Sequence, residues 1–231
     1  MTRLLASVRS VAEARIALEG GADIIDLKEP SAGALGAVPL TVTAAVVRLA
    51  TRQLPVSATV GDQPMHPPTL ARVVAETAAT GVDFVKVGLF GAGPFDSCIE
   101  AVARAQRGGA RLVAVLFADR APPVHLSDAL AAAGFSGVML DTADKRAGSL
   151  RAHATDHVLH RFVAGAREAR LLVGLAGSLT VADIPPLLAL RPDYLGFRGC
   201  LCTRSARESA LDTGALADVR RRIPRAEPAL T

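Results

Sequence analysis

The sequence is poor in aromatic residues, which restricts both its core and its partners. It has no Trp, one Tyr and seven Phe among 231 residues, although half of the residues are hydrophobic. A large core can form, but it must be built mainly from Ala, Val, Leu and Ile, as in α/β barrels. Without aromatic stacking residues, the run Arg220-Arg221-Arg222 is better explained as a solvated helix end than as a nucleic-acid patch. The net charge of +4 hints instead at anionic ligands.

Long apolar runs and paired cysteines are also missing. No run reaches the roughly 18 apolar residues of a membrane-spanning helix. The apolar part of segment 1–15 is too short for a secretory signal. Cys98, Cys200 and Cys202 lack metal-site spacing, which indicates reduced thiols. We therefore expect a cytoplasmic protein with neither a membrane nor a nucleic acid as its partner.

Lysine is the rarest charged residue. Of 26 basic residues only three are lysines, namely Lys28, Lys86 and Lys145. Arg can replace Lys on most surfaces, but not where a neutral amine is required. The three lysines are therefore either chance survivors of a coding bias toward Arg or functional amines, and their positions must decide between the two.

Short β-rich runs recur along the chain and alternate with helical patterns. Capping-box patterns at 10–13 and 97–100 open two of the helices. Eight strands alternating with helices favour a closed parallel barrel over an open doubly wound sheet, and no GxGxxG follows the first strand. We predict an α/β protein with a single (β/α)8 TIM barrel over 1–224 and a flexible C-terminal tail over 225–231. The expected strands are Leu4–Val8, Ala22–Leu27, Val56–Gly61, Phe84–Leu89, Arg111–Phe117, Gly137–Asp141, Leu171–Leu175 and Tyr194–Phe197.

A faint internal repeat supports the barrel and orients its charged residues. Three strand segments align on an aspartate, and the alignment gives Asp26, Lys28, Lys86 and Arg198 the same parity. Side chains alternate along a strand, so these four should point into the barrel near its C-terminal end, where barrel enzymes carry their sites. The apolar residues between them should face the helices: Ile25, Leu27, Val85, Val87 and Phe197. The aligned aspartates are Asp23, Asp83 and Asp193.

The lysines are placed for amine chemistry. Lys28, Lys86 and Asp141 lie at strand ends, and Lys145 follows Asp141 by four residues. Grouped ammonium ions disfavour each other's charge, so one amine can become neutral and attack a carbonyl to form an iminium ion. Asp26 would oppose this at Lys28 unless its main partner is another cation. The alternative is a set of purely structural ion pairs with sequence neighbours, such as Glu29 and Asp144.

Two Gly-rich segments late in the chain suggest phosphate binding. Barrels often bind phosphate through the loops after strands seven and eight. Gly177 and Gly199 would expose backbone amides there, Ser178 a hydroxyl, and Arg198 a fixed positive charge. Either Gly-rich segment taken alone could simply be a turn.

We expect no metal site and no cofactor. His153, His157 and His160 could share one helix face with metal-like spacing. Their segment is polar and rich in charged residues, however, which favours a solvated helix.

Five motifs, in this order, resemble those of the (5-formylfuran-3-yl)methyl phosphate synthase family. The first is the most specific, and the others are short and gain weight from their order. The resemblance spans essentially the whole chain. The motifs are DIIDLKEPSAGALGA at 23–37, FVKVGL at 84–89, DTADK at 141–145, LAGSL at 175–179 and GFRG at 196–199.

The resemblance implies a barrel enzyme of methanofuran-type cofactor biosynthesis. It implies a lyase that condenses two glyceraldehyde 3-phosphate molecules, with loss of one phosphate and of water. By the same resemblance Lys28 is the Schiff-base lysine, Lys86 the proton acceptor, and Asp141 and Lys145 complete the catalytic group. Departures from the family pattern lie mainly in loops such as 63–68 and in the tail. They therefore affect the prediction of a homo-oligomer more than the prediction of the chemistry.

Two other functions stay open on the sequence. One is a Schiff-base aldolase of the deoxyribose-phosphate type, which uses the same barrel and a lysine pair but releases an ordinary aldol. The other is an inactive barrel that only binds phosphate esters, although the retained lysines argue against it.

Overall fold

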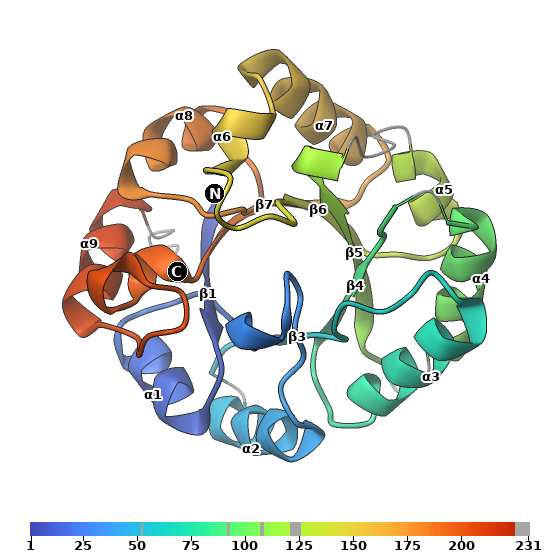
Figure 1. Cartoon of the computed structure of the whole chain (residues 1–231), viewed down its shortest axis with the longest axis horizontal. Coiled ribbons are helices and arrows are strands. Elements are labelled where there is room, and N and C mark those ends of the chain that lie inside the picture. Colours follow the sequence, from blue (N-terminus) through green and yellow to red (C-terminus); the bar gives the residue numbers. More distant parts are fainter. Residues whose placement is uncertain (52, 92, 107–108, 121–125, 225–231) are drawn as a thin grey trace, which may run out of the picture.

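The chain forms a closed barrel of eight parallel strands, in a computed structural model that describes residues 1–231 except 52, 92, 107–108, 121–125 and 225–231. The strands follow chain order around the barrel, and β8 pairs back onto β1. Helices ring the barrel on its outside (Figure 1). The predicted fold class is confirmed, whereas the predicted tail, 225–231, lies outside the described residues.

The strands lie close to their expected bounds. Three match the prediction, and the other five differ by one or two residues at an end. The strands are β1 (Arg3–Val8), β2 (Ile24–Leu27), β3 (Val56–Thr59), β4 (Phe84–Gly88), β5 (Arg111–Phe117), β6 (Gly137–Asp141), β7 (Leu172–Leu175) and β8 (Tyr194–Phe197). The helices are α1 (Val11–Glu19), α2 (Leu40–Ala50), α3 (Pro67–Ala78), α4 (Phe95–Ala105), α5 (Ser127–Ala132), α6 (Leu150–His153), α7 (Asp156–Glu168), α8 (Ile184–Ala189) and α9 (Thr213–Arg222).

Of the two predicted capping sites, one is confirmed and the other is wrong. Ser10 caps α1, and its hydroxyl accepts a hydrogen bond from the Glu13 backbone N–H at 3.2 Å. Ser97, by contrast, lies inside α4, which begins at Phe95 after Pro94. Proline has no N–H to leave unsatisfied and has a fixed φ, which suits a helix start, and α4 begins three residues before the start that a Ser97 cap would give.

The aspartates of the internal repeat fix the register of neighbouring strands. Each precedes an even-numbered strand, and its carboxylate accepts a hydrogen bond from a backbone N–H of the strand before it. One sequence plan therefore supplies the same strand-to-strand lock three times. Each of these bonds is 2.7 Å long, and they join Asp23 to Leu4, Asp83 to Val56 and Asp193 to Val173.

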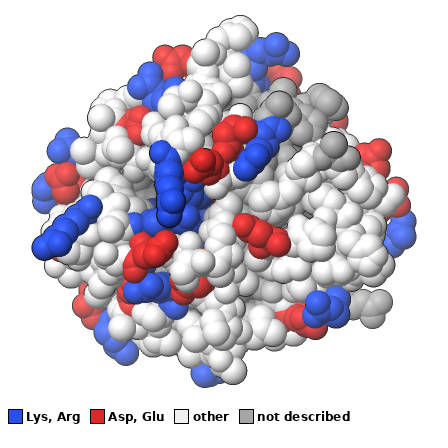
Figure 2. Space-filling model, in the orientation of Figure 1, with Lys and Arg blue, Asp and Glu red and all other residues white. Residues whose placement is uncertain are grey.

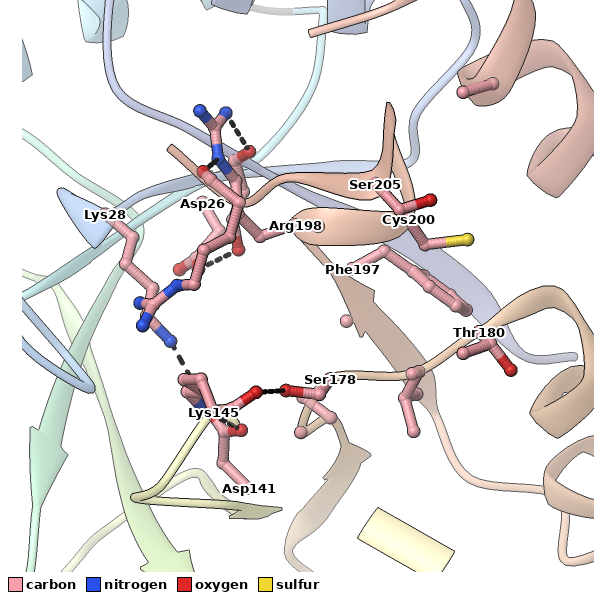
Figure 3. A pocket seen from close by; sticks show the side chains of 18 of the residues that line it. Asp26, Lys28, Asp141, Lys145, Ser178, Thr180, Phe197, Arg198, Cys200 and Ser205 are labelled. Atoms are coloured by element: carbon pink, nitrogen blue, oxygen red, sulfur yellow. Dashed lines mark hydrogen bonds and ion pairs between the residues drawn. The ribbon is translucent and has the colours of Figure 1, made fainter. Parts of the chain in front are cut away.

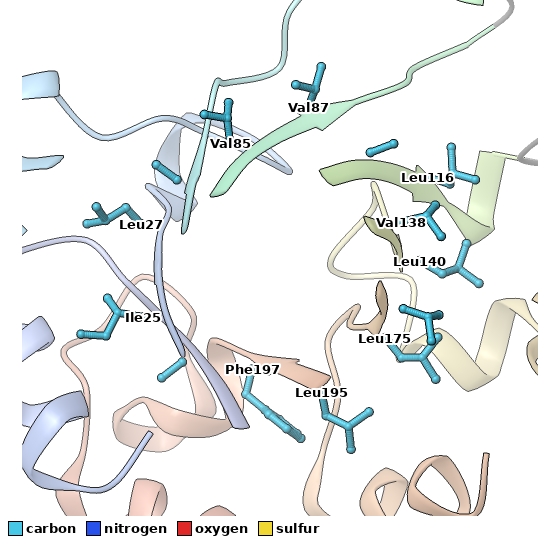
Figure 4. Close-up of a cluster of buried hydrophobic side chains, with 14 of the residues drawn as sticks. Ile25, Leu27, Val85, Val87, Leu116, Val138, Leu140, Leu175, Leu195 and Phe197 are labelled. Carbon is cyan, nitrogen blue, oxygen red and sulfur yellow. The ribbon is translucent and has the colours of Figure 1, made fainter. Parts of the chain in front are cut away.

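The strands bury an apolar layer on each of their two faces. Toward the helices, the residues predicted to face outward all belong to the main buried core (Figure 4). Inside the barrel, a second cluster includes Ile24, Phe84 and Tyr194, the first residues of β2, β4 and β8, and fills the end where the strands begin, although it also reaches Phe117 at the end of β5. The barrel is thus closed by apolar side chains at one end and free for polar residues at the other.

Glycine makes room for the inner cluster at β7. A Cβ at Gly174 would lie 2.2 Å from the ring of Tyr194, so the tyrosine can occupy the barrel interior only beside glycine. Within the described part of the chain, the helices are all too short or too polar to cross a membrane.

Candidate active site

A cavity of about 450 Å³ opens at the end of the barrel where the strands finish. In the view down the barrel, Lys and Arg side chains gather in a hollow near the centre of this face (Figure 2). All nine site residues predicted from the sequence line the cavity. They are Asp26, Lys28, Lys86, Asp141, Lys145, Gly177, Ser178, Arg198 and Gly199.

Asp26 and Lys86 form a buried ion pair at the base of the cavity. The Lys86 Nζ lies 3.0 Å from Asp26 Oδ1, and both residues are buried. Ser7 and Ser57, which face Asp26 in the adjoining strands, donate their hydroxyls to its carboxylate at 2.8 and 2.6 Å. Burial alone would raise the pKa of Asp26, but Lys86, Ser57 and the charge of Lys28 hold it below its ordinary value. The main partner of Asp26 is therefore Lys86, which leaves Lys28 without that carboxylate.

Lys28 shares a different carboxylate with Lys145 (Figure 3). Asp141, the last residue of β6, lies 3.3 Å from the Lys28 Nζ and 2.5 Å from the Lys145 Nζ. Lys145 also donates to the carbonyl of Thr142. Burial opposes the charge of Asp141, but the two ammonium groups and the Thr142 N–H hold its pKa far below the ordinary value. The buried Lys28 and the partly buried Lys145 thus depend on one carboxylate.

This crowding acts most visibly on Lys145. Burial lowers the pKa of Lys145 to about 8, and the positive charge of Lys28 lowers it too, while Asp141 opposes both. An amine with this pKa is neutral in roughly one molecule in ten near pH 7, against less than one in a thousand for an ordinary lysine. Lys145 is therefore suited to exchange protons within the cavity.

The purely structural alternative expected Lys28 to pair with Glu29 and Lys145 to pair with Asp144. In this structure both carboxylates have other partners. Glu29 accepts hydrogen bonds from the backbone N–H and the hydroxyl of Ser31. Asp144 accepts one from the N–H of Arg146. Lys28 and Lys86 instead pair with carboxylates on other strands, and Lys145 pairs with Asp141, four residues before it at the end of β6.

Two aspartates that the sequence analysis missed hold the loops that border the site. Asp119, just after β5, accepts hydrogen bonds from the backbone N–H groups of Ala143 and Asp144 at 2.8 and 2.7 Å, in the loop that carries Lys145. Burial raises the pKa of Asp119, but these amides lower it below its ordinary value.

Asp62, just after β3, holds the loop beyond Lys28 through hydrogen bonds of the same kind. It accepts from the N–H groups of Ala34 and Leu35 at 2.7 and 2.6 Å. The shared signal is an aspartate two or three residues after a strand end, which could have been recognised in the sequence.

Arg198 has a full set of protein partners. Its two terminal nitrogens form a bidentate ion pair with Glu13 of α1, at 2.5 and 3.2 Å. It also donates to the carbonyls of Ser7, Arg207 and Ser209. These bonds engage all five N–H donors of a guanidinium group. A direct contact of Arg198 with phosphate would require one of them to open, and its phosphate role stays a prediction.

The glycine-rich segments after β7 and β8 bring backbone to the wall of the cavity. Gly177 has a φ of 112°, a conformation that favours glycine, and a Cβ there would lie 2.9 Å from Thr142. Ser178 is exposed and donates its hydroxyl to the carbonyl of Lys145 at 3.0 Å. Gly199 begins the short 3-10 helix η5 (Gly199–Leu201), directly after Arg198.

The histidines do not gather into a site. His153 ends α6, whereas His157 and His160 lie in α7, so the expectation that they could share one helix face is wrong. The helical pattern is interrupted between them, because Thr155 caps α7 with its side chain. Among the described residues no group of three or more His, Cys, Asp or Glu side chains could hold a metal ion.

Comparisons with known proteins agree with the sequence motifs. The family model described as 4-HFC-P synthase matches residues 4–220. A Methylorubrum extorquens protein named putative (5-formylfuran-3-yl)methyl phosphate synthase is 45% identical over 230 residues, covering 98% of this chain and 95% of that protein. The (5-formylfuran-3-yl)methyl phosphate synthase of Archaeoglobus fulgidus is 38% identical over 212 residues, covering 87% of this chain and 90% of the relative. That of Methanopyrus kandleri is 37% identical over 216 residues, covering 89% and 91%.

Solved structures share the barrel at low sequence identity. A 3-hexulose-6-phosphate synthase superposes with a TM-score of 0.67 at 22% identity, covering 96% of this chain and 100% of that one. Phosphoribosyl anthranilate isomerase from Thermus thermophilus gives a TM-score of 0.66 at 15% identity, covering 96% and 98%. At these identities the likeness shows the fold alone.

Proposed function

Because this chain belongs to the 4-HFC-P synthase family, we propose that it is a lyase that makes (5-formylfuran-3-yl)methyl phosphate. Its substrates are two molecules of glyceraldehyde 3-phosphate, and the atoms balance when one phosphate and two water molecules leave. The observation that carries the proposal is the convergence of Lys28, Lys86, Lys145, Asp26 and Asp141 on one cavity of about 450 Å³. Formation of a furan in this way supplies methanofuran-type cofactor biosynthesis.

Lys28 forms the Schiff base. Its amine is buried, and it shares Asp141 with Lys145, which lies closer to that carboxylate. One carboxylate cannot compensate two ammonium groups fully, and the pKa of Lys145 is lowered to about 8, so Lys145 loses its proton more readily than an ordinary lysine and can exchange protons with its neighbour. The neutral amine of Lys28 adds to the aldehyde carbon, and loss of water gives the iminium ion.

Lys86, in its neutral form, accepts the proton that the iminium makes acidic. It reaches the cavity from β4, and Asp26 holds its amine at 3.0 Å. Removal of the proton from the carbon next to the iminium drives elimination of phosphate from one triose and then formation of the carbon–carbon bond to the other. Asp141 and Lys145 exchange protons with the intermediates on the opposite side.

The loops after β7 and β8 bind substrate phosphate. Gly177 and Gly199 bring backbone to the cavity, Ser178 brings a hydroxyl, and Arg198 adds positive charge behind them. Substituting Ser178 or Arg198 should therefore weaken substrate binding more than it slows bound substrate, because ground-state contacts act mainly on affinity. A loss of turnover alone at Arg198 would count against its phosphate role.

Product analysis tests the activity. The purified protein is incubated with glyceraldehyde 3-phosphate, and the products are followed by mass spectrometry and near-ultraviolet absorbance. A furan aldehyde absorbs there, whereas the product of a simple aldolase does not. An absorbing product with the mass of the furan phosphate supports the proposal. An aldol mass assigns the chain to the aldolase alternative, and inertness with measurable phosphate-ester binding assigns it to the binding barrel.

Borohydride trapping tests the nucleophile. Borohydride added during turnover should reduce the iminium to a stable adduct on the peptide that carries Lys28. An adduct on the Lys86 peptide would reverse the two roles. If no adduct forms and Lys28→Arg stays active, the Schiff-base mechanism is wrong, because Arg stays charged and cannot attack a carbonyl.

The cytoplasmic location and the assembly state stay predictions. A homo-oligomer is compatible with the sequence, and light scattering of the purified protein would decide it.

A further inference from the structure

Arg207 lines the same cavity, although none of the sequence motifs includes it. It lies in the segment 203–210 that follows β8, and one of its terminal nitrogens donates to the carbonyl of Gly33 at 3.0 Å, across the mouth of the barrel. Gly33 belongs to the loop beyond Lys28, so the arginine side chain bridges two loops over the cavity. A guanidinium group has five N–H donors, and this bond uses one of them.

The segment is held so that Arg207 must face the cavity. Arg198 donates to the carbonyl of Arg207 at 2.8 Å and to that of Ser209 at 2.9 Å, which ties the segment to the end of β8. Arg204 and Ser205 have φ values of 55° and 54°, a conformation that costs non-glycine residues free energy. Strain of this kind persists only where the surroundings impose the backbone path.

The charges of the cavity leave Arg207 available to an anion. Lys86 pairs with Asp26, Lys28 and Lys145 share Asp141, and Arg198 pairs with Glu13 of α1. Among the ion pairs of the described residues Arg207 takes part in none, so its positive charge adds to that of the two lysines on one carboxylate. The charge of Arg207 also contributes to the lowered pKa of Lys145, which is expected of cations that share a cavity.

We propose that Arg207 is the direct ligand of a second phosphate group, the one that leaves during the reaction, while Gly177, Ser178 and Gly199 hold the phosphate that is retained. This inference rests on the proposed function, since two phosphorylated trioses must occupy one cavity and only one phosphate remains in the product. Arg198 then acts as a positioning residue, because its own donors hold the segment that carries Arg207.

The elimination step gives this position its chemistry. Lys86 takes the proton from the carbon next to the iminium, and the carbon–oxygen bond to phosphate breaks with its electron pair on the oxygen. The protonated Lys145 supplies the proton that the leaving phosphate needs, and the fork of Arg207 meets the growing negative charge at the mouth of the barrel, from which phosphate departs.

Titration with inorganic phosphate tests the assignment without requiring turnover. The intact protein, in a phosphate-free buffer of low salt, is titrated by calorimetry, and two binding events are expected in the wild type. In Arg207→Ala one of them should weaken about ten- to hundredfold, as expected for loss of a charge-assisted contact. Arg204→Ala is the matched control, because it removes the same charge from the same segment at an exposed position. Ser178→Ala should weaken the other event.

Every outcome decides the proposal. It is overturned if phosphate binding in Arg207→Ala equals that of the wild type, if Arg204→Ala weakens binding to the same degree, or if the wild type binds no phosphate that depends on Arg207. Thermal melting of each variant separates a lost contact from a lost fold, and Arg207→Lys, which keeps the charge without the fork, should bind with intermediate affinity. A protein that makes no furan yet loses one phosphate event in Arg207→Ala refutes the proposed function and leaves this site standing.

Discussion

Replacing Lys86 by Met should destabilise the fold far more than removing both members of its ion pair. Lys86 is 2% exposed and Asp26 is 1% exposed, and their charged atoms lie 3.0 Å apart. Lys86→Met leaves a buried carboxylate with two hydroxyl donors and without its ion-pair partner. Breaking a buried pair in this way costs about 3–5 kcal/mol. For a chain of this length that is a fall in Tm of roughly 6–20 °C.

The double variant Asp26→Asn/Lys86→Met separates charge from packing. Asn can still bond to Ser7 and Ser57, and Met fills most of the space left by the lysine stem. The free energy of unfolding of the double variant should lie within about 1–2 kcal/mol of the wild-type value, because replacing a buried ion pair as a whole often changes stability little. Urea unfolding, followed by circular dichroism, of the wild type, the single variants Lys86→Met and Asp26→Asn and the double variant gives the coupling energy of the pair.

The pH dependence of stability gives a second, independent test of this prediction. The folded pKa of Asp26 lies below its ordinary 3.8, so its contribution to stability is present above that pH and is lost as the pH falls through the folded value. In Lys86→Met the buried carboxylate has lost its main cation, so its pKa should rise above 3.8 and the variant should gain stability as the pH drops from 7 toward 5. A variant that is within about 1 kcal/mol of wild type, or that has the wild-type slope over this range, would refute the reasoning.

Three further predictions follow from other contacts. Since Lys145 has a pKa of about 8, the elimination step, which uses its protonated amine, should slow as the pH rises through 8, and a pH–rate profile that keeps this limb in Lys145→Gln would contradict the assignment. Asp119→Ala removes the hydrogen-bond acceptor of two amides in the loop that carries Lys145, so kcat should fall at least tenfold in steady-state kinetics. Thermal melting should show that the free energy of unfolding falls by only about 1–2 kcal/mol. Gly174→Ala should cost about 1–3 kcal/mol through its clash with Tyr194, whereas Gly165→Ala in α7, with open space around it, should stabilise by about 0.5–1 kcal/mol; equal Tm values for the two would be inconsistent with this packing.

The strand pattern predicted which residues enter the barrel, because alternation along a strand is a local property. Asp26, Lys28 and Lys86 share a parity, and all three line the cavity at the predicted end. The strand-end position of Asp141 placed it there as well. These members of the cavity lining could thus be predicted from the sequence.

The pairing inside the cavity could not be predicted, because it depends on the register between strands. Asp26 lies opposite Ser57, and Lys86 lies opposite Thr59 of the same strand, which brings the Lys86 amine to Asp26 rather than to a neighbour in sequence. The position of Arg207 depends on a non-repetitive backbone path and on donors from Arg198. No periodic pattern encodes such a path, so the sequence analysis assigned a phosphate role to Arg198 and none to Arg207.

The ion pair between Arg198 and Glu13 has a consequence for how the chain reaches its fold. The two residues are 185 positions apart, and their contact lies beside the seam where β8 meets β1. As the chain emerges from the ribosome, Glu13 and the free edge of β1 must wait for nearly the whole of the remaining sequence. Closure of the ring is therefore a late event with a high loop-closure cost, and the same event that completes the sheet also fixes the segment that carries Arg207. A chain halted before β8 would have most of its strands but neither the seam nor a finished cavity.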